Sequence, residues 1–426
     1  MKIAHYEQII SPELGNKIAG YGGFDVACRK TDDLVLSALA LDDGQHKALL
    51  LSYDLISIDE TMLDRIRSEA AKVLGIPDDY VIISCTHTHQ GPHSCTHPVH
   101  FELFDEQYME QLMDWTCEAA EKLKDSFIDV DAYFYSSKVD ANVNRRFVKR
   151  DNRGDTFPVH RDMESLADEY CDQELGLLIF MQAGGHTPVA VLANYAAHPL
   201  ATHAPGLGEH TITSDYPGFL RKAVMYESGA ACIFVSGAAG DMFPKESELG
   251  QAAARRMAEK LCSAIMIAMI DAYRQPKRFK ILNPEIKALR TKVDFKRRMD
   301  NPSPNGGVPP YYRGKDVFTL PLQFLSIGDV ALVGVPGELL AELGQEIKWH
   351  SPFRKTFILY ASTASFDYIC HGNAFVSGGY EPWCQHMDSR GGLQLVNAAV
   401  DGLYQLKGYD AIPSLPKMVV TENDGS

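Results

Sequence analysis

The sequence predicts an α/β fold with a large mixed β-sheet as its core, helices flanking the sheet and a metal site at the strand ends. Apolar residues fall in short unbroken runs, which are typical of strands covered on both faces. Between these runs lie helical patterns with one apolar face, so strands and helices mix along the whole chain. Two of the runs end in histidine, and this observation indicates the metal site.

The predicted strands cover residues 34–41, 48–53, 80–84, 175–181, 189–195, 231–236 and 330–335. The predicted helices cover residues 60–74, 102–123, 250–272, 339–349 and 391–406. Residues 145–162 and 300–315 are polar or charged and are interrupted by Gly and Pro, which predicts a long loop at each. We expect one domain over residues 1–417, followed by a disordered tail at 418–426.

Composition excludes several classes of function. The chain has 426 residues and a net charge of −15, which argues against nucleic acid as a partner because phosphate binding needs clustered Lys and Arg. Nine cysteines without paired spacing favour a reducing compartment. The N-terminal residues lack the apolar stretch of a signal peptide, and no window reaches the roughly 18 to 20 apolar residues of a membrane span. These features predict a cytoplasmic protein that binds a small-molecule substrate.

The first chemical motif is SCTHTHQGP at residues 84–92, where an apolar run stops at two histidines. Side chains on a strand alternate between faces, so His87 and His89 are expected to point the same way. They would lie at a strand end, which is where α/β sheets bind their ligands. Two hydrogen-bonded histidines in a turn are the alternative.

The second motif is NYAAHP at residues 194–199. An apolar strand again ends in a histidine, His198, and Pro199 prevents the strand from continuing. His198 alone would be interpreted as structural. Two separate strands that end in histidine favour a shared metal site, because imidazole is a common zinc ligand.

Two further motifs carry acidic residues: VSGAAGDMFP at 235–244 contains Asp241, and VGVPGELLAELG at 333–344 contains Glu338. Asp241 follows a buried strand, and both a turn or capping role and a catalytic role are open for it. Glu338 is expected in the first turn of a helix, where capping alone would explain it. Beside two histidines, Glu338 becomes the natural anionic ligand.

Together these stretches resemble the amidase domain of the neutral, non-lysosomal ceramidase family. The likeness follows SCTHTHQGP, NVNRR at 142–146, NYAAHP, SDYPG at 214–218, GAAGDMFP and PGE, in this order along most of the chain. The resemblance implies one zinc ion per chain, held by His87, His198, Glu338 and Tyr368, with Tyr380 as the alternative to Tyr368. It also implies that His89 lies near the developing oxyanion, with Arg145 as another possible donor.

The sequence departs from the family pattern in three ways. Phe243 stands where the family's GDxSP motif carries a serine implicated in catalysis, and it has no nucleophilic atom. From the length of the sequence we expect neither the family's C-terminal immunoglobulin-like domain nor an export signal. We therefore expect metal-activated water as the nucleophile and a soluble substrate rather than ceramide in a bilayer.

The resulting hypothesis is a zinc-dependent hydrolase that cleaves the amide bond of a small soluble N-acyl compound. Asp241 would orient a histidine ligand or act as a base. Esterase or lactonase activity, a deacetylase acting on a sugar-like substrate, and a non-catalytic zinc-binding scaffold are the alternatives. Further substrate contacts or a second metal could involve four other histidines, namely His93, His97, His203 and His210.

Overall fold

The computed structural model describes residues 1–20, 26–96, 103–148, 154–156, 170–202, 210–299 and 312–409. Its main element is an eight-stranded sheet in the order β13 (Ala231–Ser236), β11 (Pro188–Tyr195), β10 (Glu174–Gln182), β6 (Ile128–Lys138), β1 (Lys2–Ile9), β3 (Val35–Asp42), β4 (Lys47–Tyr53), β5 (Val81–Cys85). The two outermost pairs, β11 with β13 and β4 with β5, are parallel. The inner pairs are antiparallel, so the sheet is mixed as predicted.

A second sheet, which the sequence did not predict as a separate unit, packs on the first. It has four strands in the order β15 (Ile286–Lys296), β16 (Val317–Ile327), β17 (Val330–Gly334), β19 (Lys355–Leu359). Apolar side chains from both sheets form one buried cluster, with Phe180 and Ile233 on the large sheet and Leu332 and Phe357 on the small one. The core is therefore a sandwich of two sheets.

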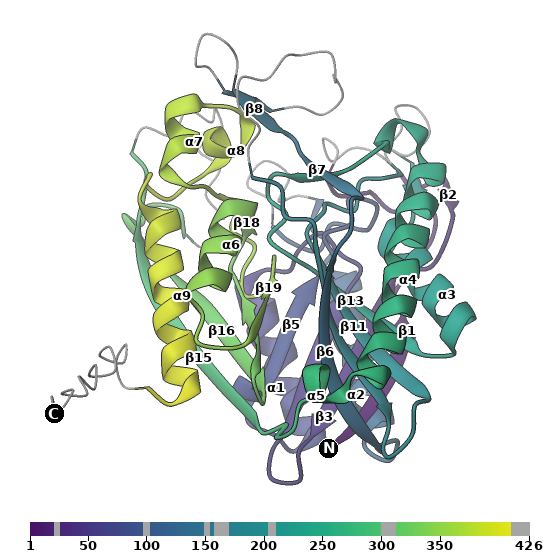
Figure 1. Ribbon diagram of the computed structural model, residues 1–426. Coiled ribbons are helices and arrows are strands. Elements are labelled where there is room, and N and C mark those ends of the chain that lie inside the picture. Colours follow the sequence, from purple (N-terminus) through teal and green to yellow (C-terminus); the bar gives the residue numbers. More distant parts are fainter. Residues whose placement is uncertain are drawn as a thin grey trace, which may run out of the picture.

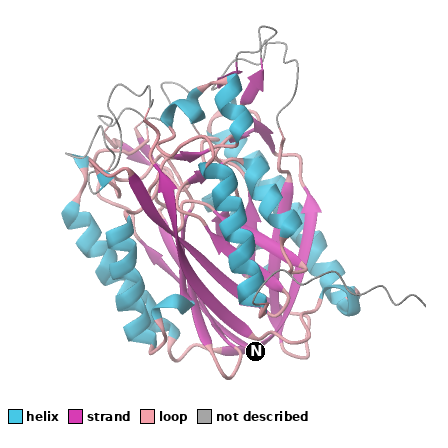
Figure 2. Cartoon of the chain, turned by 90° about the vertical axis from the view of Figure 1, so that its left-hand side faces the viewer, coloured by secondary structure: helices cyan, strands magenta, loops and turns pink. Residues whose placement is uncertain are grey.

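Helices cover both outer faces of this sandwich (Figure 1). The large sheet packs against α1 (Glu60–Leu74), α2 (Glu106–Leu123), α3 (Tyr216–Ser228) and α4 (Gln251–Arg274). The small sheet packs against α6 (Ala341–His350) and α9 (Gly391–Lys407). Figure 2, turned so that the side of α6 and α9 faces the viewer, shows helices in front of the strands. No helix in the described ranges is long and apolar enough to cross a membrane.

Short elements connect the layers. The short helices are η1 (Asp78–Tyr80), η3 (Ser247–Leu249), α5 (Pro276–Phe279), α7 (Gly372–Ser377) and α8 (Tyr380–Cys384). Two-stranded pairs join β2 (Arg29–Lys30) to β12 (Thr211–Ile212), β7 (Asn142–Asn144) to β14 (Met242–Pro244), β8 (Arg146–Val148) to β9 (Gly154–Thr156) and β18 (Glu338–Leu339) to β20 (Tyr368–Ile369).

The large sheet curls so that its two edges meet. Strand β13, at one edge, contacts β3, β4 and β5 near the other edge. The Ser52 hydroxyl on β4 donates a hydrogen bond of 2.6 Å to the carbonyl of Phe234 on β13. The Ser236 hydroxyl at the end of β13 donates one of 2.8 Å to the carbonyl of Thr86, just beyond β5. The carboxyl ends of β5, β11 and β13 therefore come together.

Most predicted elements are confirmed within a few residues, but two predictions are wrong. Glu338 does not lie in a helix: α6 begins at Ala341, and Glu338 instead pairs with Tyr368 in β18–β20. Part of the predicted loop at 145–162 forms the β8–β9 hairpin, because Arg146 and Val148 pair with β9. Most of the 300–315 loop and the tail at 418–426 lie outside the described residues.

The close approach of the two sheets can be tested at Gly176 of β10. A Cβ atom at this position would lie 2.4 Å from the Phe357 ring on β19. Gly176→Ala is therefore expected to lower the free energy of unfolding by about 1–3 kcal/mol, and Phe357→Leu in the same chain should restore part of it. Gly372→Ala, whose Cβ would meet nothing within 4 Å, is the control in denaturant unfolding. Equal losses at both glycines would contradict this packing.

Candidate metal centre

Two histidines reach the centre from the strand ends of the large sheet. His198 follows β11, as predicted. Strand β5 ends at Cys85, so His87 and His89 lie beyond it, and strand alternation does not orient them. The backbone N–H of His87 donates to the Leu55 carbonyl, and its φ of 70° turns the chain away from the sheet. The His87 and His89 rings nevertheless lie close together, with centroids 5.0 Å apart.

A backbone carbonyl fixes each imidazole through Nδ1. The Nδ1 atom of His87 donates to Ile56 at 2.6 Å, that of His198 to Met242 at 3.1 Å, and that of His89 to Gly20 at 3.2 Å. A carbonyl can only accept, so the proton resides on Nδ1 and each Nε2 keeps its lone pair. The ligand atoms of the three histidines lie within 4.8 Å of one another. Such second hydrogen bonds are typical of metal-binding histidines.

Glu338 brings a carboxylate to the same place from β18, which follows strand β17 of the small sheet along the chain and pairs with β20. Its Oε2 lies 3.3 Å from Nε2 of His198 and 3.6 Å from Nε2 of His87. Strand β18 is held against the Gly240 turn, where the Gly240 N–H donates to the Leu339 carbonyl. A Cβ at Gly240 would lie 2.6 Å from the Glu338 carbonyl oxygen, so this turn requires glycine for close approach.

Burial determines the charge of these groups. It lowers the pKa of His87 to about 4 and the pKa of His89 well below its usual value, so both imidazoles are neutral near pH 7. Burial opposes the ionisation of Glu338, but His87, His198 and the Arg145 guanidinium hold its pKa well below the usual range. Neutral imidazole and ionised carboxylate are the forms that bind a metal ion.

The donor set therefore fits a cation. Nε2 of His87 is buried and has no hydrogen-bond partner among the described residues. The Nε2 atoms of His87 and His198 and the Glu338 carboxylate present lone pairs to one another. A buried group of acceptors is costly unless a donor or a cation satisfies it. Two imidazoles with one carboxylate are a ligand set that zinc accepts.

Tyr360 also lies in the centre, and the sequence prediction missed it. Its hydroxyl donates to Oε2 of Glu338 at 3.0 Å and lies 3.3 Å from Nε2 of His198. Its ring centroid is 4.8 Å from that of His87. Tyr360 directly follows β19, a short strand that is not among the predicted ones, so the rule that led to His198, a polar side chain just after an apolar strand, did not reach it.

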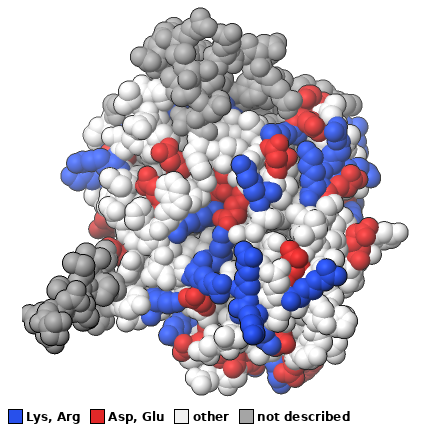
Figure 3. Space-filling view, viewed as in Figure 1, with Lys and Arg blue, Asp and Glu red and all other residues white. Residues whose placement is uncertain are grey.

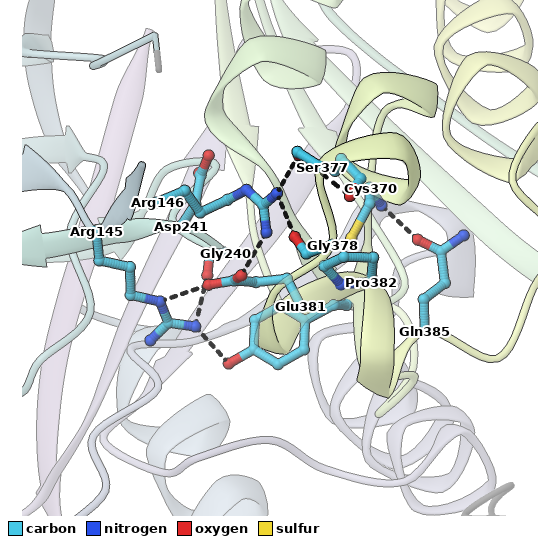
Figure 4. A network of polar contacts seen from close by, with 12 residues as sticks. Arg145, Arg146, Gly240, Asp241, Cys370, Ser377, Gly378, Glu381, Pro382 and Gln385 are labelled. Atoms are coloured by element: carbon cyan, nitrogen blue, oxygen red, sulfur yellow. Dashed lines mark hydrogen bonds and ion pairs between the residues drawn. The ribbon is translucent and has the colours of Figure 1, made fainter. Parts of the chain in front are cut away.

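The predicted residues Arg145 and Tyr368 belong to a neighbouring network. Figure 4 shows Arg145 of this network together with Arg146, Gly240 and Glu381. Arg145 donates through Nε to Glu381 at 2.8 Å, and through Nη2 to the Tyr368 hydroxyl at 2.9 Å and the Gly240 carbonyl at 3.0 Å. The second Glu381 oxygen accepts from Arg146 at 2.7 Å. The buried Glu381 carboxylate thus fixes both guanidinium groups and, through Arg145, the Tyr368 hydroxyl. Tyr380, the alternative tyrosine, stacks edge-on against Tyr368 with centroids 5.5 Å apart.

Asp241 supports the centre indirectly. Its carboxylate accepts from the backbone N–H of Ala341, at the start of α6, and from the side chain of Asn144, both at 2.8 Å. Its contacts in the described part of the chain include no histidine, so it does not orient a histidine ligand by direct contact. The next residue, Met242, supplies the carbonyl that holds His198. Asp241 therefore fixes the turn on which His198 depends.

The remaining predicted residues lie outside the centre. Phe243 is buried in β14 opposite Val143. His93 is buried and His210 is exposed, and neither joins a group of three potential ligands in the described ranges. His97 and His203 fall outside those ranges.

Comparison with known proteins supports the fold. No family model matches the sequence, and no curated protein matches it. The structure is similar to the crystal structure of neutral ceramidase from Pseudomonas aeruginosa, with a TM-score of 0.76 and 15% identity over 97% of this chain and 76% of that one. It is also similar to a ceramidase complexed with C2, with a TM-score of 0.73 and 15% identity over 98% of this chain and 77% of that one. The chain therefore has a neutral ceramidase-like fold.

The position of His89 can be tested through Gly20. Gly20 and Gly15 both have φ of +100°, but a Cβ at Gly20 would lie 2.4 Å from Nδ1 of His89, whereas one at Gly15 would meet nothing within 4 Å. Both alanine variants are expected to lose about 1–3 kcal/mol of stability through backbone strain. Gly20→Ala should lose about 1–3 kcal/mol more by overlap, and His89→Ala in the same chain should relieve that extra loss. Equal stability of the two glycine variants would place His89 elsewhere.

Asp241 gives a prediction on pH. Burial raises the pKa of its carboxyl from 3.8 to about 6, so the folded protein keeps a proton that the unfolded chain loses between these values. The stability present below pH 4 is lost as the pH rises through 6. Asp241→Asn does not titrate, so we expect the advantage of the wild type over this variant to shrink by about 2 kcal/mol between pH 4 and pH 7. Denaturant unfolding with chelator present would measure it, and a constant difference would contradict the raised pKa.

Proposed function

We propose that this chain is a zinc-dependent hydrolase that cleaves the C–N bond of a small N-acyl compound. The observation that carries the proposal is the convergence of the buried His87 and His198 with the partly buried Glu338, whose Oε2 lies 3.3 and 3.6 Å from Nε2 of His198 and of His87. Amide hydrolysis is the activity that the likeness to ceramidases supports. When bound, zinc would supply Lewis-acid activation of the amide carbonyl and of water.

The protein residues suit attack by water. Phe243, where the family motif has serine, offers no nucleophile. His89 presents an unprotonated Nε2, because its Nδ1 proton is engaged with the Gly20 carbonyl. An imidazole in this tautomer accepts a proton from water and can return it to the leaving amine, which is the role of a general base and acid. We therefore assign proton transfer to His89.

Arg145 would contact the substrate directly, whereas Asp241 would affect the reaction only through other residues. Nε and Nη2 of Arg145 are bound to Glu381, Gly240 and Tyr368, so Nη1 is the atom through which Arg145 would contact a substrate oxygen. Asp241 would act only through the turn that carries Met242 and thereby His198.

Metal content tests the centre. Wild-type protein purified without chelator is expected to contain about one zinc per chain, as the resemblance implies, and His87→Ala, His198→Ala and Glu338→Ala should lose it. His350→Ala is the matched control, because His350 is exposed at the end of α6 and bonds to the Glu346 carbonyl. A folded wild type that binds no added zinc would contradict the proposal.

Activity tests the reaction. The zinc-loaded wild type should hydrolyse amides in a panel of N-acyl compounds and their matching esters. His89→Ala should keep its zinc and lose a factor of about 10²–10⁴ in kcat. Loss of zinc in His89→Ala would make His89 a ligand instead. Cleavage of the esters alone would favour an esterase, and a zinc-loaded protein inactive on both panels would favour a non-catalytic scaffold.

A further inference from the structure

We propose that the phenol oxygen of Tyr360 is the fourth ligand of the metal in this centre, and that Tyr368 is not a ligand. The inference rests on the proposed metal site at His87, His198 and Glu338. It departs from the ligand set that the sequence motifs implied, in which Tyr368 supplied the phenol.

The first argument is geometric. Ligands of a tetrahedral zinc ion at about 2.0–2.1 Å lie about 3.3–3.4 Å from one another. Oε2 of Glu338 lies 3.3 and 3.6 Å from Nε2 of His198 and of His87. The Tyr360 oxygen lies 3.0 Å from the same Oε2 and 3.3 Å from Nε2 of His198. These four spacings are those of ligands that surround one ion.

The second argument counts protons. Nδ1 of His87 and of His198 faces a carbonyl, so the neutral imidazole that binds a metal carries its hydrogen on Nδ1 and a lone pair on Nε2 at both positions. The Glu338 carboxylate only accepts, so the Tyr360 hydroxyl supplies the single hydrogen among the four atoms. That hydrogen can satisfy one acceptor, and Tyr360 and His198 are completely buried. A cation at the centre of the group would satisfy all four atoms at once.

The third argument concerns Tyr368. Its hydroxyl accepts a hydrogen bond of 2.9 Å from Arg145, whose guanidinium is fixed by the buried Glu381. Among the described residues the Tyr368 hydroxyl makes no hydrogen bond to His87, His198 or Glu338, whereas the Tyr360 hydroxyl contacts both His198 and Glu338. The backbone N–H of Tyr360 instead donates to the Ser236 carbonyl, which fixes the position of this residue at the end of β19. Its hydroxyl lies among the proposed metal ligands.

The test compares three conservative variants that each remove one buried hydroxyl: Tyr360→Phe, Tyr368→Phe and Tyr53→Phe. Tyr53 is the matched control, because it is fully buried and its hydroxyl bonds to Thr116 away from the centre. Zinc affinity is measured by competition with a chromophoric chelator. Protein loaded with Fe(III) or Cu(II) is then examined for the visible charge-transfer band of a metal-bound phenolate. Unfolding with chelator present checks that each apoprotein is folded.

We expect the band in the wild type, in Tyr368→Phe and in Tyr53→Phe, and its loss in Tyr360→Phe together with zinc affinity weakened at least about tenfold. Loss of the band in Tyr368→Phe alone, or absence of the band from a wild type that binds one metal ion, would overturn this inference and leave the proposed hydrolase intact. A wild type that binds neither zinc nor the probe metals would overturn both.

Discussion

The curl of the eight-stranded sheet is the constraint on which the centre depends. Strands β5 and β11 lie far apart in the strand order, so in a flat sheet the histidines that follow them would not meet. Two serine hydroxyls close the curl by reaching from one edge to backbone carbonyls at the other. The amide of Asn194 extends the closure to the second sheet, since it donates to the carbonyls of Val235 and Ile358. These hydrogen bonds to backbone carbonyls thus fix how far apart the donor atoms of the metal centre lie.

Orientation of the donors is likewise a property of the backbone. Each imidazole is held by a main-chain carbonyl, that of Ile56 for His87, of Gly20 for His89 and of Met242 in β14 for His198. The carboxylate sits on a two-residue strand pressed against a glycine turn. Asp241 contributes by holding that turn to the start of α6. A centre fixed in this way is preorganised, because the lone pairs converge before any ligand arrives.

Sequence reasoning found the parts of the centre that follow strongly apolar strands. His87, His198 and Asp241 come after apolar runs that are buried over most or all of their length, and such runs are visible in a single sequence. The second sheet was missed because β15 is mostly half-exposed and mixes polar with apolar residues, which weakens its signal. Glu338 was assigned to a helix because β18 exists only through its long-range pairing with β20. The position of Tyr360 depends on how the two sheets pack, which motif spacing does not encode.

The wide separation of the donors along the chain, after strands of the large sheet and of the small one, has a thermodynamic consequence. An ion held by His87 and Glu338 would tie together two points roughly 250 residues apart in the chain. It would act as a cross-link that closes a long loop, in the manner of a disulfide. Metal binding and the docking of one sheet on the other would then be linked equilibria. Availability of the ion would thereby govern the lifetime of the folded chain as well as its chemistry.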